Sequence, residues 1–273
     1  MIPADDAAFL ELTRSIFSEV GLSLAGYKDK CLRRRIAVRM RACGAHTYAE
    51  YQAVLQRDRE EYERLKDVIT INVTRFYRNV ETWNLVRTRL LPELCAAERP
   101  GLRAWSAGCS SGEEPYTLTM LIADHLAAQG RADRLGLVTV DATDIDRQCL
   151  ARAQTARYPR GALADVPASL AARYFEDHGA ECRVIEPIRR RVVVRASDLC
   201  VDPPPGRNYD LILCRNVVIY FGRATQERVF QAFADALAPG GFLVLGKVES
   251  LFGQARESLI LLDPRERIYR RAA

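Results

Sequence analysis

Through roughly the first 75 residues, apolar side chains recur every three or four positions, which is the spacing of amphipathic helices. Asp5 or Asp6 can cap the first of these helices at its start. Its apolar face is predicted to consist of Phe9, Leu12, Ile16 and Phe17. Two more helices are predicted over Thr47–Leu55 and Glu61–Ile69. We therefore expect an all-helical N-terminal domain over residues 1–75.

A further helix predicted in this domain, Lys28–Cys43, is strongly basic. At about 100° per residue, one face consists of apolar side chains: Leu32, Ile36 and Met40. The opposite face carries Lys30, Arg34 and Arg41. A run of charges on a helix is usually a solvated face, but this basic stripe would also fit an acidic partner.

After a polar and aromatic connector, Ile69–Asn79, a helix is predicted from about Trp83 to Cys95, so that residues 76–97 link two domains. Strands and helices then alternate. Strands are predicted at Arg103–Ala107, Leu137–Thr143, Tyr209–Cys214 and Phe242–Leu245, and helices at Pro115–Ala128, Arg147–Thr155 and Thr225–Leu237. This alternation is typical of a mostly parallel, doubly wound α/β sheet, which we expect over residues 98–273.

The segment Ala156–Ser197 does not follow this alternation. The stretches Cys182–Ile185 and Arg191–Arg195 have the pattern of short strands, and Glu186 and Pro187 separate them. We interpret the two stretches as an antiparallel hairpin. A small antiparallel β-subdomain, inserted in the α/β domain, is therefore expected over residues 157–197.

The first predicted strand ends in a run of small residues, Ser106 to Gly112, followed by Glu113 and Glu114. In an α/β sheet such a turn lies at the carboxyl end of the strand, where nucleotide-like ligands bind, and Gly108 allows a ligand to approach the backbone. The two carboxylates would repel a phosphate. S-adenosylmethionine has no phosphate and carries positive charge, so it fits better. The alternative is an ordinary helix N-terminus, where acids are also common.

Polar residues also follow the other predicted strands. Asp144 ends the second strand, where a carboxylate can accept hydrogen bonds from both hydroxyls of a ribose. Either Asp144 or Asp146 could instead cap the next helix. Asn216 and Tyr220 can bond to a cofactor or substrate, or serve a turn. Asp198 is predicted to lie beside an adenine, and an ordinary loop position is the alternative.

The composition of the chain limits the classes of protein to which it can belong. The 273 residues are 48% hydrophobic and 27% charged, as in ordinary globular proteins. No apolar run approaches the length of a membrane span, and no signal peptide is recognisable, so we expect a cytoplasmic protein without membrane insertion. The eight cysteines lack a C-x-x-C pair, and with three histidines they give no convincing metal site. The net charge of +5 is mild and aromatic interleaving is missing, so no nucleic-acid partner is expected.

Five short motifs follow one another along nearly the whole chain. They are N-x-T-x-F-x-R from Asn72 to Arg78, W-S-A-G-C-S-S-G-E-E-P-Y from Trp105 to Tyr116, T-D-I-D from Thr143 to Asp146, C-R-N-V-x-I-Y-F from Cys214 to Phe221, and P-G-G-x-L from Pro239 to Leu243. With these motifs behind a basic helical N-terminus, the chain resembles the CheR family. This family consists of S-adenosylmethionine-dependent methyltransferases that methylate glutamates of bacterial chemotaxis receptors.

The resemblance implies a Rossmann-like methyltransferase domain with a small β-subdomain, behind a helical domain that recognises the receptor. It implies a cofactor site lined by Asn72, Thr74, Arg78, Glu114, Asp144, Asp198, Leu199 and Asn216. Within this set, Asp144 would bind the ribose, and Asp198, Leu199 and Asn216 would lie near the adenosine. Arg78 and Tyr220 would lie beside the methyl group that is transferred. The basic stripe Lys30, Arg34 and Arg41 would bind the acidic, helical cytoplasmic region of the receptor.

Some members of this family dock the C-terminal peptide of a receptor through a glycine-rich turn near an arginine in the β-subdomain. The corresponding segment here, Gly179–Arg183, lacks that glycine pattern. We therefore do not expect this chain to dock a receptor tail.

The reaction implied is an in-line displacement in which a glutamate oxygen attacks the sulfonium methyl and S-adenosylhomocysteine leaves. A glutamate with a pKa of about 4.3 is already ionised at neutral pH, so neither a general base nor a metal is required. Two other interpretations remain open. One is a non-catalytic module that senses S-adenosylmethionine in a signalling array, and the other is a small-molecule O-methyltransferase.

Overall fold

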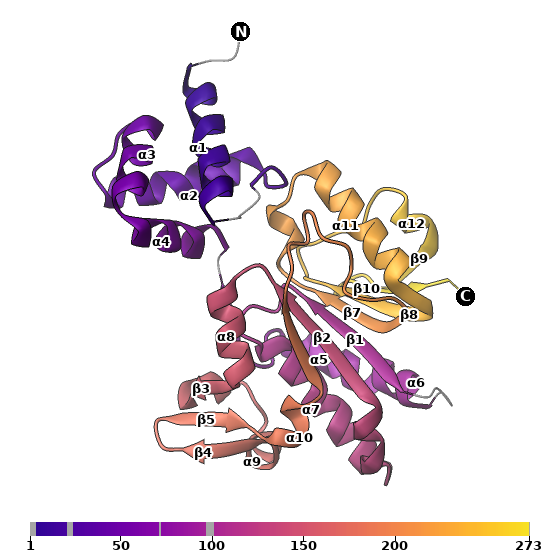
Figure 1. The fold of residues 1–273 in the computed structure, drawn as a ribbon. Helices are drawn as coiled ribbons and strands as arrows, with labels where there is room; N and C mark the ends of the chain where they lie inside the picture. The colour runs from indigo at the N-terminus through magenta and orange to yellow at the C-terminus, as the bar shows by residue number, and fades with distance from the viewer. Residues whose placement is uncertain (1–3, 21–23, 71, 97–100, 273) are drawn as a thin grey trace. The chain divides into compact units, whose positions relative to one another are not determined.

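The computed structural model describes residues 4–20, 24–70, 72–96 and 101–272 (Figure 1). The chain forms two compact units. One unit contains Met1–Asn72 together with Tyr220–Gln226, and the other contains Val73–Ile219 and Glu227–Ala273. The short segment from the second half of the chain joins the first unit through backbone hydrogen bonds, from Lys28 N to Tyr220 O (2.9 Å) and from Gly222 N to Gly26 O (2.8 Å).

The described part of the first unit is built from helices, as the apolar spacing predicts. The helices are α1 (Ala4–Val20), α2 (Asp29–Ala42), α3 (Tyr48–Arg57) and α4 (Arg59–Thr70). The side chains of Phe9, Leu12 and Ile16 are buried, but that of Phe17 is 56% exposed. The prediction that Phe17 belongs to the apolar face is wrong, because one residue beyond Ile16 the helix has turned by about 100° toward solvent.

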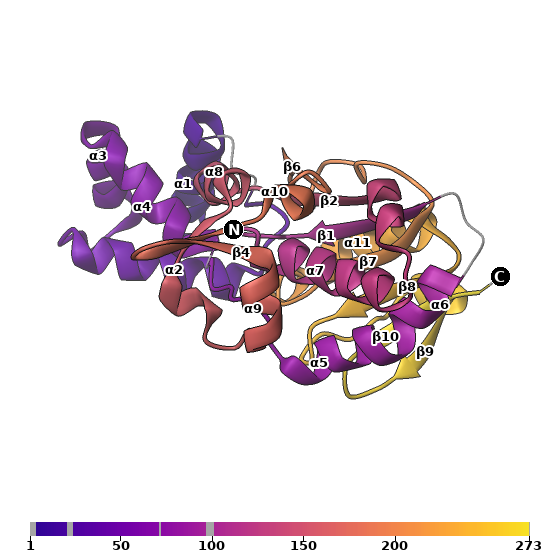
Figure 2. The ribbon, with the colours of Figure 1, turned by 90° about the horizontal axis from the view of Figure 1, so that it is seen from below.

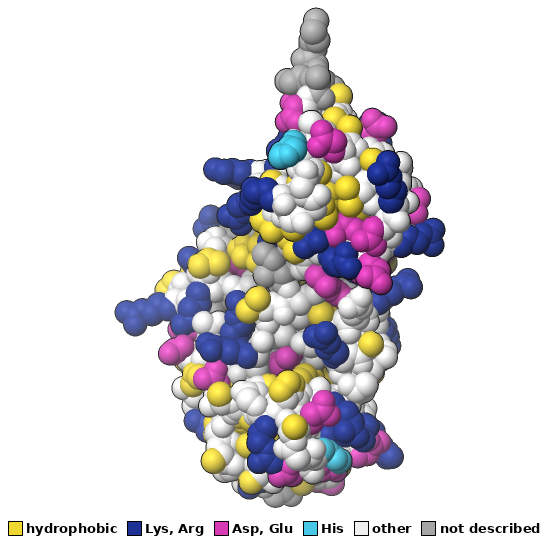
Figure 3. All heavy atoms as spheres, turned by 90° about the vertical axis from the view of Figure 1, so that its left-hand side faces the viewer, with side chains coloured by type: hydrophobic (Ala, Val, Ile, Leu, Met, Phe, Trp, Pro, Cys, Tyr) yellow, Lys and Arg dark blue, Asp and Glu magenta, His cyan; other side chains and the backbone are white. Residues whose placement is uncertain are grey.

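Helix α2 has the two faces that its sequence predicts. Leu32, Ile36 and Met40 are buried. Lys30, Arg34 and Arg41 are exposed on the other side. Figure 3 shows one side of this unit, where Lys and Arg side chains lie on the surface, several of them next to Asp and Glu side chains. The basic stripe is therefore available to solvent in the helical unit.

A buried ionic group links three helices of this unit. The carboxylate of Glu61, on α4, is 1% exposed. It accepts hydrogen bonds from Arg39 Nε (2.9 Å) and Nη2 (2.6 Å) on α2 and from the Tyr51 hydroxyl (2.7 Å) on α3. Burial opposes ionisation of Glu61, but these hydrogen bonds outweigh that effect and hold its pKa below the usual value.

A seven-stranded sheet forms the centre of the second unit. Its strands, in spatial order, are β6 (Val192–Ala196), β2 (Val138–Asp144), β1 (Leu102–Ala107), β7 (Tyr209–Cys214), β8 (Leu237–Leu245), β10 (Ile268–Arg271) and β9 (Leu259–Asp263). The first five run parallel, whereas β10 is antiparallel to both of its neighbours. The predicted doubly wound sheet is confirmed, and the chain order reverses between β1 and β7, which is where such sheets bind ligands.

Helices cover both faces of this sheet. Successive strand residues point to opposite faces. Ala104 of β1 belongs to the core that includes Leu118 and Ile122 of α7 (Glu113–Ala128), whereas the ring of the next residue, Trp105, meets Phe233 of α11 (Arg223–Ala236) edge to face at 5.2 Å. Figure 2, a view from below, shows α7 on the near side of the sheet.

The remaining elements are short. Before the sheet come α5 (Val80–Leu85), a π-helical turn (Val86–Leu90) and α6 (Leu91–Ala96), and after β2 comes α8 (Arg147–Thr155). Further helices are α9 (Ala168–Tyr174), α10 (Glu186–Arg189) and α12 (Ala255–Ser258), and 3-10 turns span Ala132–Leu137, Arg160–Leu163 and Val218–Tyr220. None of the described helices combines the length and the hydropathy that crossing a bilayer requires.

The inserted segment forms a small antiparallel sheet, but not from the two strands that the sequence indicated. Its strands are β3 (Arg157–Pro159), β5 (Glu181–Val184) and β4 (Phe175–His178) in spatial order. The predicted hairpin between Cys182–Ile185 and Arg191–Arg195 is wrong, because β6 pairs in parallel with β2 in the large sheet. The β-branched run of Val192, Val193 and Val194 fits either an edge strand or a hairpin, and only the pairing partner distinguishes the two.

Replacing Glu61 tests the buried ionic group. Glu61→Ala leaves the Arg39 guanidinium partly buried without its counter-charge, so the free energy of unfolding of the helical unit should fall by about 3 kcal/mol. The loss is measured by far-ultraviolet circular dichroism in urea. The neighbouring control Glu60→Ala removes a side chain that is 82% exposed and pairs with Arg64, and should cost under about 0.5 kcal/mol. Equal losses for the two variants would contradict this role.

Candidate functional site

The carboxyl ends of four neighbouring strands carry residues that the sequence singled out. Gly108 follows β1, Asp144 ends β2, Asp198 follows β6 and Asn216 follows β7. Strands β6, β2, β1 and β7 are adjacent and parallel, so these residues lie along one edge of the sheet. A direct link supports this, since Ser197 N donates to Asp144 O at 2.9 Å. The fold therefore brings four residues from distant parts of the chain to one edge of the sheet.

The turn after β1 needs glycine at Gly108 for two reasons. Its φ of +82° is a left-handed conformation that disfavours other residues. A Cβ atom there would lie 2.4 Å from Val217 Cγ2, so the loop after β7 also excludes it. The N–H groups of Gly108 and Cys109 both donate to Thr143 O, at 2.8 and 2.9 Å. The backbone at this turn is thus fixed between β2 and the loop after β7.

Asp144 and Asp146 have different roles. Asp146 caps α8, since its carboxylate accepts hydrogen bonds from Gln148 N (2.8 Å) and Cys149 N (3.2 Å). The Asp144 carboxylate accepts backbone hydrogen bonds from Ser110 N (2.8 Å) on one oxygen and from Asp146 N (2.9 Å) on the other. Each oxygen keeps acceptor capacity for a ligand. Burial raises the pKa of Asp144, and these hydrogen bonds oppose the shift.

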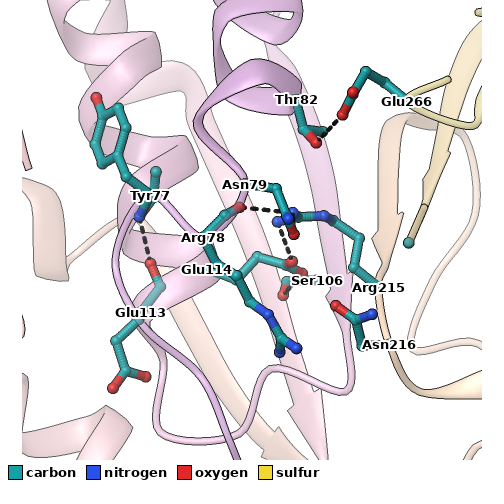
Figure 4. A network of polar contacts seen from close by, with 12 residues as sticks. Tyr77, Arg78, Asn79, Thr82, Ser106, Glu113, Glu114, Arg215, Asn216 and Glu266 are labelled. Atoms are coloured by element: carbon teal, nitrogen blue, oxygen red, sulfur yellow. Dashed lines mark hydrogen bonds and ion pairs between the residues drawn. The ribbon is translucent and has the colours of Figure 1, made fainter. Parts of the chain in front are cut away.

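Arg215, directly after β7, holds the site together and was not singled out from the sequence. Its side chain is 3% exposed, and its Nη1 lies 3.3 Å from Glu114 Oε2 on α7. Its Nη2 donates to Arg78 O (2.7 Å) and Asn79 Oδ1 (2.9 Å) in the connector. Figure 4 shows the guanidinium between Asn79 and Glu114. The guanidinium therefore joins a strand end, a helix start and the connector.

The two acids at the start of α7 are both engaged within the protein. Glu114 accepts a hydrogen bond from Ser106 Oγ (2.8 Å) on its other oxygen, and the single hydroxyl of Ser111 lies 3.0 and 2.8 Å from the two oxygens of Glu113, which share its proton. Burial raises the pKa of Glu114, and the charge of Arg215 opposes that shift. Glu114 therefore acts in the described structure as the counter-charge of Arg215.

Glu249 shapes the loop that carries Asn216. Its buried carboxylate accepts hydrogen bonds from the backbone N–H groups of Gly246 (2.5 Å), Asn216 (3.0 Å) and Val217 (2.9 Å). Asn216 is held with a φ of +62°, which is unusual outside glycine. Sequence reasoning did not single out Glu249 as functional. A glutamate just after the buried strand β8 was the available signal, since a carboxylate there needs donors.

Two buried acceptor atoms in the site have no donor among the described residues. They are Oδ2 of Asp198 and Oδ1 of Asn216. The other oxygen of Asp198 accepts a hydrogen bond from Cys200 N (2.8 Å), and burial raises the pKa of this carboxyl group. Native structures rarely leave buried acceptors unsatisfied. The two atoms therefore fit a ligand with N–H or O–H donors, such as the adenosyl group of S-adenosylmethionine.

The connector contributes Thr74 and Arg78, and the turn after Asp198 contributes Leu199; all three side chains are half-buried. Arg78 Nη1 donates to Val73 O at 2.6 Å, and the backbone oxygen of Arg78 accepts from Arg215. Arg78 is thus held at both its backbone and its guanidinium. Among the residues that the structure describes, no cluster of three or more His, Cys, Asp or Glu could hold a metal ion.

Two residues predicted for the site, Asn72 and Tyr220, belong to the helical unit. Asn72 Nδ2 donates to Thr70 Oγ1 at 3.1 Å. The ring of Tyr220 lies against the guanidinium of Arg35, whose central carbon is 4.2 Å from the ring centroid.

Arg35 is a further residue that sequence reasoning missed. It is 3% exposed, and it donates one hydrogen bond through Nη1 to Ile69 O. Its Nε and Nη2 have no acceptor among the described residues. The signal in the sequence is an arginine next to Ile36, on the apolar side of a basic helix. A buried guanidinium with spare donors is suited to binding a carboxylate.

Two protein-family models match this chain. Residues 72–266 match the model described as CheR methyltransferase, SAM binding domain. Residues 7–70 match the model described as CheR methyltransferase, all-alpha domain. The two matches together cover both units and nearly the whole chain.

Named relatives are similar over almost the same length. The chemotaxis protein methyltransferase of Listeria monocytogenes is 32% identical over 263 residues, which cover 96% of this chain and 97% of the relative. The chemotaxis protein methyltransferase of Klebsiella aerogenes is 31% identical over 265 residues, covering 94% and 87%. A crystal structure of a TehB-like SAM-dependent methyltransferase from Corynebacterium glutamicum covers 70% of this chain and 93% of its own, at 18% identity and a TM-score of 0.36.

The role of Arg215 can be tested with single and double variants. Arg215→Met leaves Glu114, whose side chain is only 13% exposed, without a counter-charge, so the free energy of unfolding should fall by about 3–5 kcal/mol at neutral pH. Because the pKa of Glu114 is already raised, the loss should shrink as the pH is lowered and Glu114 takes up a proton. Both tryptophans, Trp83 and Trp105, lie in this unit, so their fluorescence in urea reports its unfolding.

The double variant, Arg215→Met with Glu114→Gln, provides the matched control. It removes both charges, so it should recover part of the lost stability and lose the pH dependence. A double variant no more stable than Arg215→Met would show that the ion pair is not what holds these elements together.

Proposed function

Since the chain belongs to the CheR methyltransferase family, we propose that it transfers the methyl group of S-adenosylmethionine to glutamate side chains of chemotaxis receptors. The family is one of S-adenosylmethionine-binding methyltransferases, and the named relatives act in chemotaxis. The observation that carries the proposal is the row of acceptors along one sheet edge, of which Asp198 Oδ2 and Asn216 Oδ1 are buried and have no donor in the part of the chain that the structure describes.

The residues at the sheet edge fit this cofactor. In the proposal, Asp144 accepts the two ribose hydroxyls, and Asp198 and Asn216 accept from amino groups of the cofactor. Gly108 admits it close to the backbone, and Leu199 offers apolar contact. The resemblance adds Asn72, Thr74 and Glu114 to the lining. When bound, S-adenosylmethionine supplies an electrophilic methyl group on a positively charged sulfur.

The protein's own contribution to the transfer would be alignment. A glutamate acceptor is ionised at neutral pH, so no residue needs to remove a proton from it. We propose that Arg78 orients the acceptor carboxylate through a charge-assisted hydrogen bond and that Tyr220 lies beside the methyl group. Holding two reactants in attack geometry can lower a barrier by roughly 7–11 kcal/mol. This proposal assigns no metal and no general base.

The helical unit would recognise the receptor. Its exposed stripe Lys30, Arg34 and Arg41 fits an acidic helical surface, and such charges act mainly on encounter rate and register. Arg35 supports an acidic substrate independently, because its buried Nε and Nη2 have no acceptor among the described residues and it lies against Tyr220. A cytoplasmic region of a receptor is the substrate that the family relationship favours.

Asp144 gives the first test of the cofactor site. Asp144→Asn replaces the two acceptor oxygens of a charged carboxylate by one neutral amide oxygen. The affinity for S-adenosylhomocysteine should therefore fall by about 10–100-fold, as expected for loss of a charged hydrogen bond. Isothermal titration calorimetry measures the change. The exposed control Asp133→Asn should bind as the unaltered protein does. Unchanged affinity in Asp144→Asn would remove the ribose role.

The affinity should also depend on pH with a defined sign. Burial raises the pKa of Asp144, so the folded protein without cofactor holds this proton more tightly than the unfolded chain does. Binding to the ionised carboxylate must compete with that proton. Affinity for S-adenosylhomocysteine should therefore weaken as the pH falls through the raised pKa, and this dependence should disappear in Asp144→Asn.

Methyl transfer itself is tested with labelled S-adenosylmethionine and membranes that contain chemotaxis receptors. The expected product is a base-labile methyl ester on receptor protein. Reversing two charges of the stripe, Lys30→Glu with Arg34→Glu, should raise the KM for receptor, most strongly at low salt, and leave cofactor affinity unchanged. The control is Arg59→Glu, which reverses an exposed charge elsewhere in the unit. Cofactor binding without any ester would instead indicate a sensing module.

A further inference from the structure

The loop that follows strand β7 is held by a residue of the loop that follows β8. This residue, Glu249, is 3% exposed. Its Oε2 accepts hydrogen bonds from Gly246 N (2.5 Å) and Asn216 N (3.0 Å), and its Oε1 accepts one from Val217 N (2.9 Å). Burial raises the pKa of this carboxyl group, and backbone hydrogen bonds, including one from Ile219, oppose the shift. A single buried carboxylate therefore fixes the backbone of most of this loop.

The backbone held in this way has an unfavourable conformation. Asn216 has a φ of +62°, in the left-handed region that residues with side chains rarely adopt, so surrounding contacts must stabilise it. The contact is also tight. A Cβ atom at Gly246 would lie 2.7 Å from Glu249 Oε2 and 2.9 Å from Asn216 N. Glycine at position 246 thus leaves room for the bond between Glu249 and Asn216.

Fixing this loop also fixes an acceptor of the candidate cofactor site. Oδ1 of Asn216 is buried and has no donor among the residues that the structure describes. The next residue, Val217, packs against the turn after β1, where a Cβ atom at Gly108 would lie 2.4 Å from its Cγ2. A loop that is already held in its binding conformation loses less conformational freedom when a ligand binds, and the affinity is higher for that reason.

We propose that Glu249 is a positioning residue for cofactor binding, which holds the Asn216 acceptor in its binding orientation before the cofactor binds. The inference rests on the proposed function, because it takes the adenosyl group of S-adenosylmethionine as the donor to Asn216. Glu249 does not need to touch the cofactor, since its carboxylate accepts hydrogen bonds from the backbone and acts through the loop. A carboxylate fits this position because it has two acceptor oxygens and no donor.

Glu249→Gln tests the proposal by isothermal titration calorimetry with S-adenosylhomocysteine. Glutamine has nearly the same shape, but its NH2 group replaces one acceptor oxygen and would face backbone N–H donors. The dissociation constant should rise by about tenfold, as expected for loss of one hydrogen bond to the ligand. The control Val248→Ala alters a 73% exposed side chain of the same loop and should bind as the unaltered chain does. Tryptophan fluorescence in urea checks that each variant is folded.

A double-mutant cycle with Asn216→Ala separates positioning from a loss of stability. If Glu249 acts through Asn216, Glu249→Gln should weaken binding little further once the Asn216 side chain is absent. Additive losses would show that Glu249 does not act through Asn216 and would overturn the proposal. Unchanged affinity in Glu249→Gln would also overturn it and leave the proposed function standing. An unaltered chain without affinity for S-adenosylhomocysteine would overturn both.

Amide hydrogen exchange of the unaltered chain, measured by nuclear magnetic resonance, gives a test that needs no variant. The N–H groups of Asn216 and Val217 should be protected before any cofactor is added, because they already donate to Glu249. Amides that exchange freely and become protected only when S-adenosylhomocysteine binds would mean that the ligand orders the loop. That result would contradict positioning by Glu249.

Discussion

The ion pair between Arg215 and Glu114 is the interaction on which the candidate site depends. A buried arginine and a buried glutamate are costly to remove from water unless each finds further partners. Arg215 donates hydrogen bonds to the backbone oxygen of Arg78 and to the side chain of Asn79, and its guanidinium lies 5.3 Å from the ring centroid of Trp83. Glu114 accepts a hydrogen bond from the hydroxyl of Ser106. Because these partners come from separate elements, satisfying the two charges fixes the connector, the end of β7 and the start of α7 together.

Buried carboxylates give the sheet edge its chemical character. Burial raises the pKa of Glu114, Asp144, Asp198 and Glu249 alike, which means that the protein makes each negative charge harder to keep. Glu114 and Glu249 are compensated inside the protein by Arg215 and by backbone N–H groups. Asp144 and Asp198 retain acceptor capacity toward a ligand. Such an edge disfavours a phosphate and favours a ligand with donors and positive charge, in agreement with the S-adenosylmethionine-binding family to which the chain belongs.

The two units differ in which of their buried polar groups lack a partner among the described residues. In the helical unit, the buried carboxylate of Glu61 is paired with Arg39 and Tyr51. The guanidinium of Arg35, which lies against the ring of Tyr220, has two nitrogen atoms without an acceptor among the described residues. At the sheet edge of the α/β unit, the acceptor atoms Asp198 Oδ2 and Asn216 Oδ1 have no partner among the described residues. One unit therefore offers donors suited to an acidic group, and the other offers acceptors suited to a cationic nucleoside.

Local pattern was sufficient for most of the fold. The helix Arg147–Thr155 and the strand Tyr209–Cys214 have the bounds that the sequence predicts, because turn residues and apolar periodicity mark both ends of each. The same reasoning picked out Gly108, Asp144, Asp198 and Asn216, since each follows a strand directly. It failed where pairing is not local: β6 has the composition of a hairpin strand, yet its partner is β2, more than 40 residues away in the chain.

The sequence by itself thus determined the two kinds of domain, the positions of the main strands along the chain and the small and acidic residues at their ends, because each is encoded within a few neighbouring positions. Only the tertiary structure decided which charges are partners. Arg215 meets Glu114 across 101 positions and Asn79 across 136, and Glu249 meets Asn216 across 33. No spacing rule links residues so far apart in the chain. These charged groups need partners because they are buried, and they become buried only when the sheet and its helices have packed.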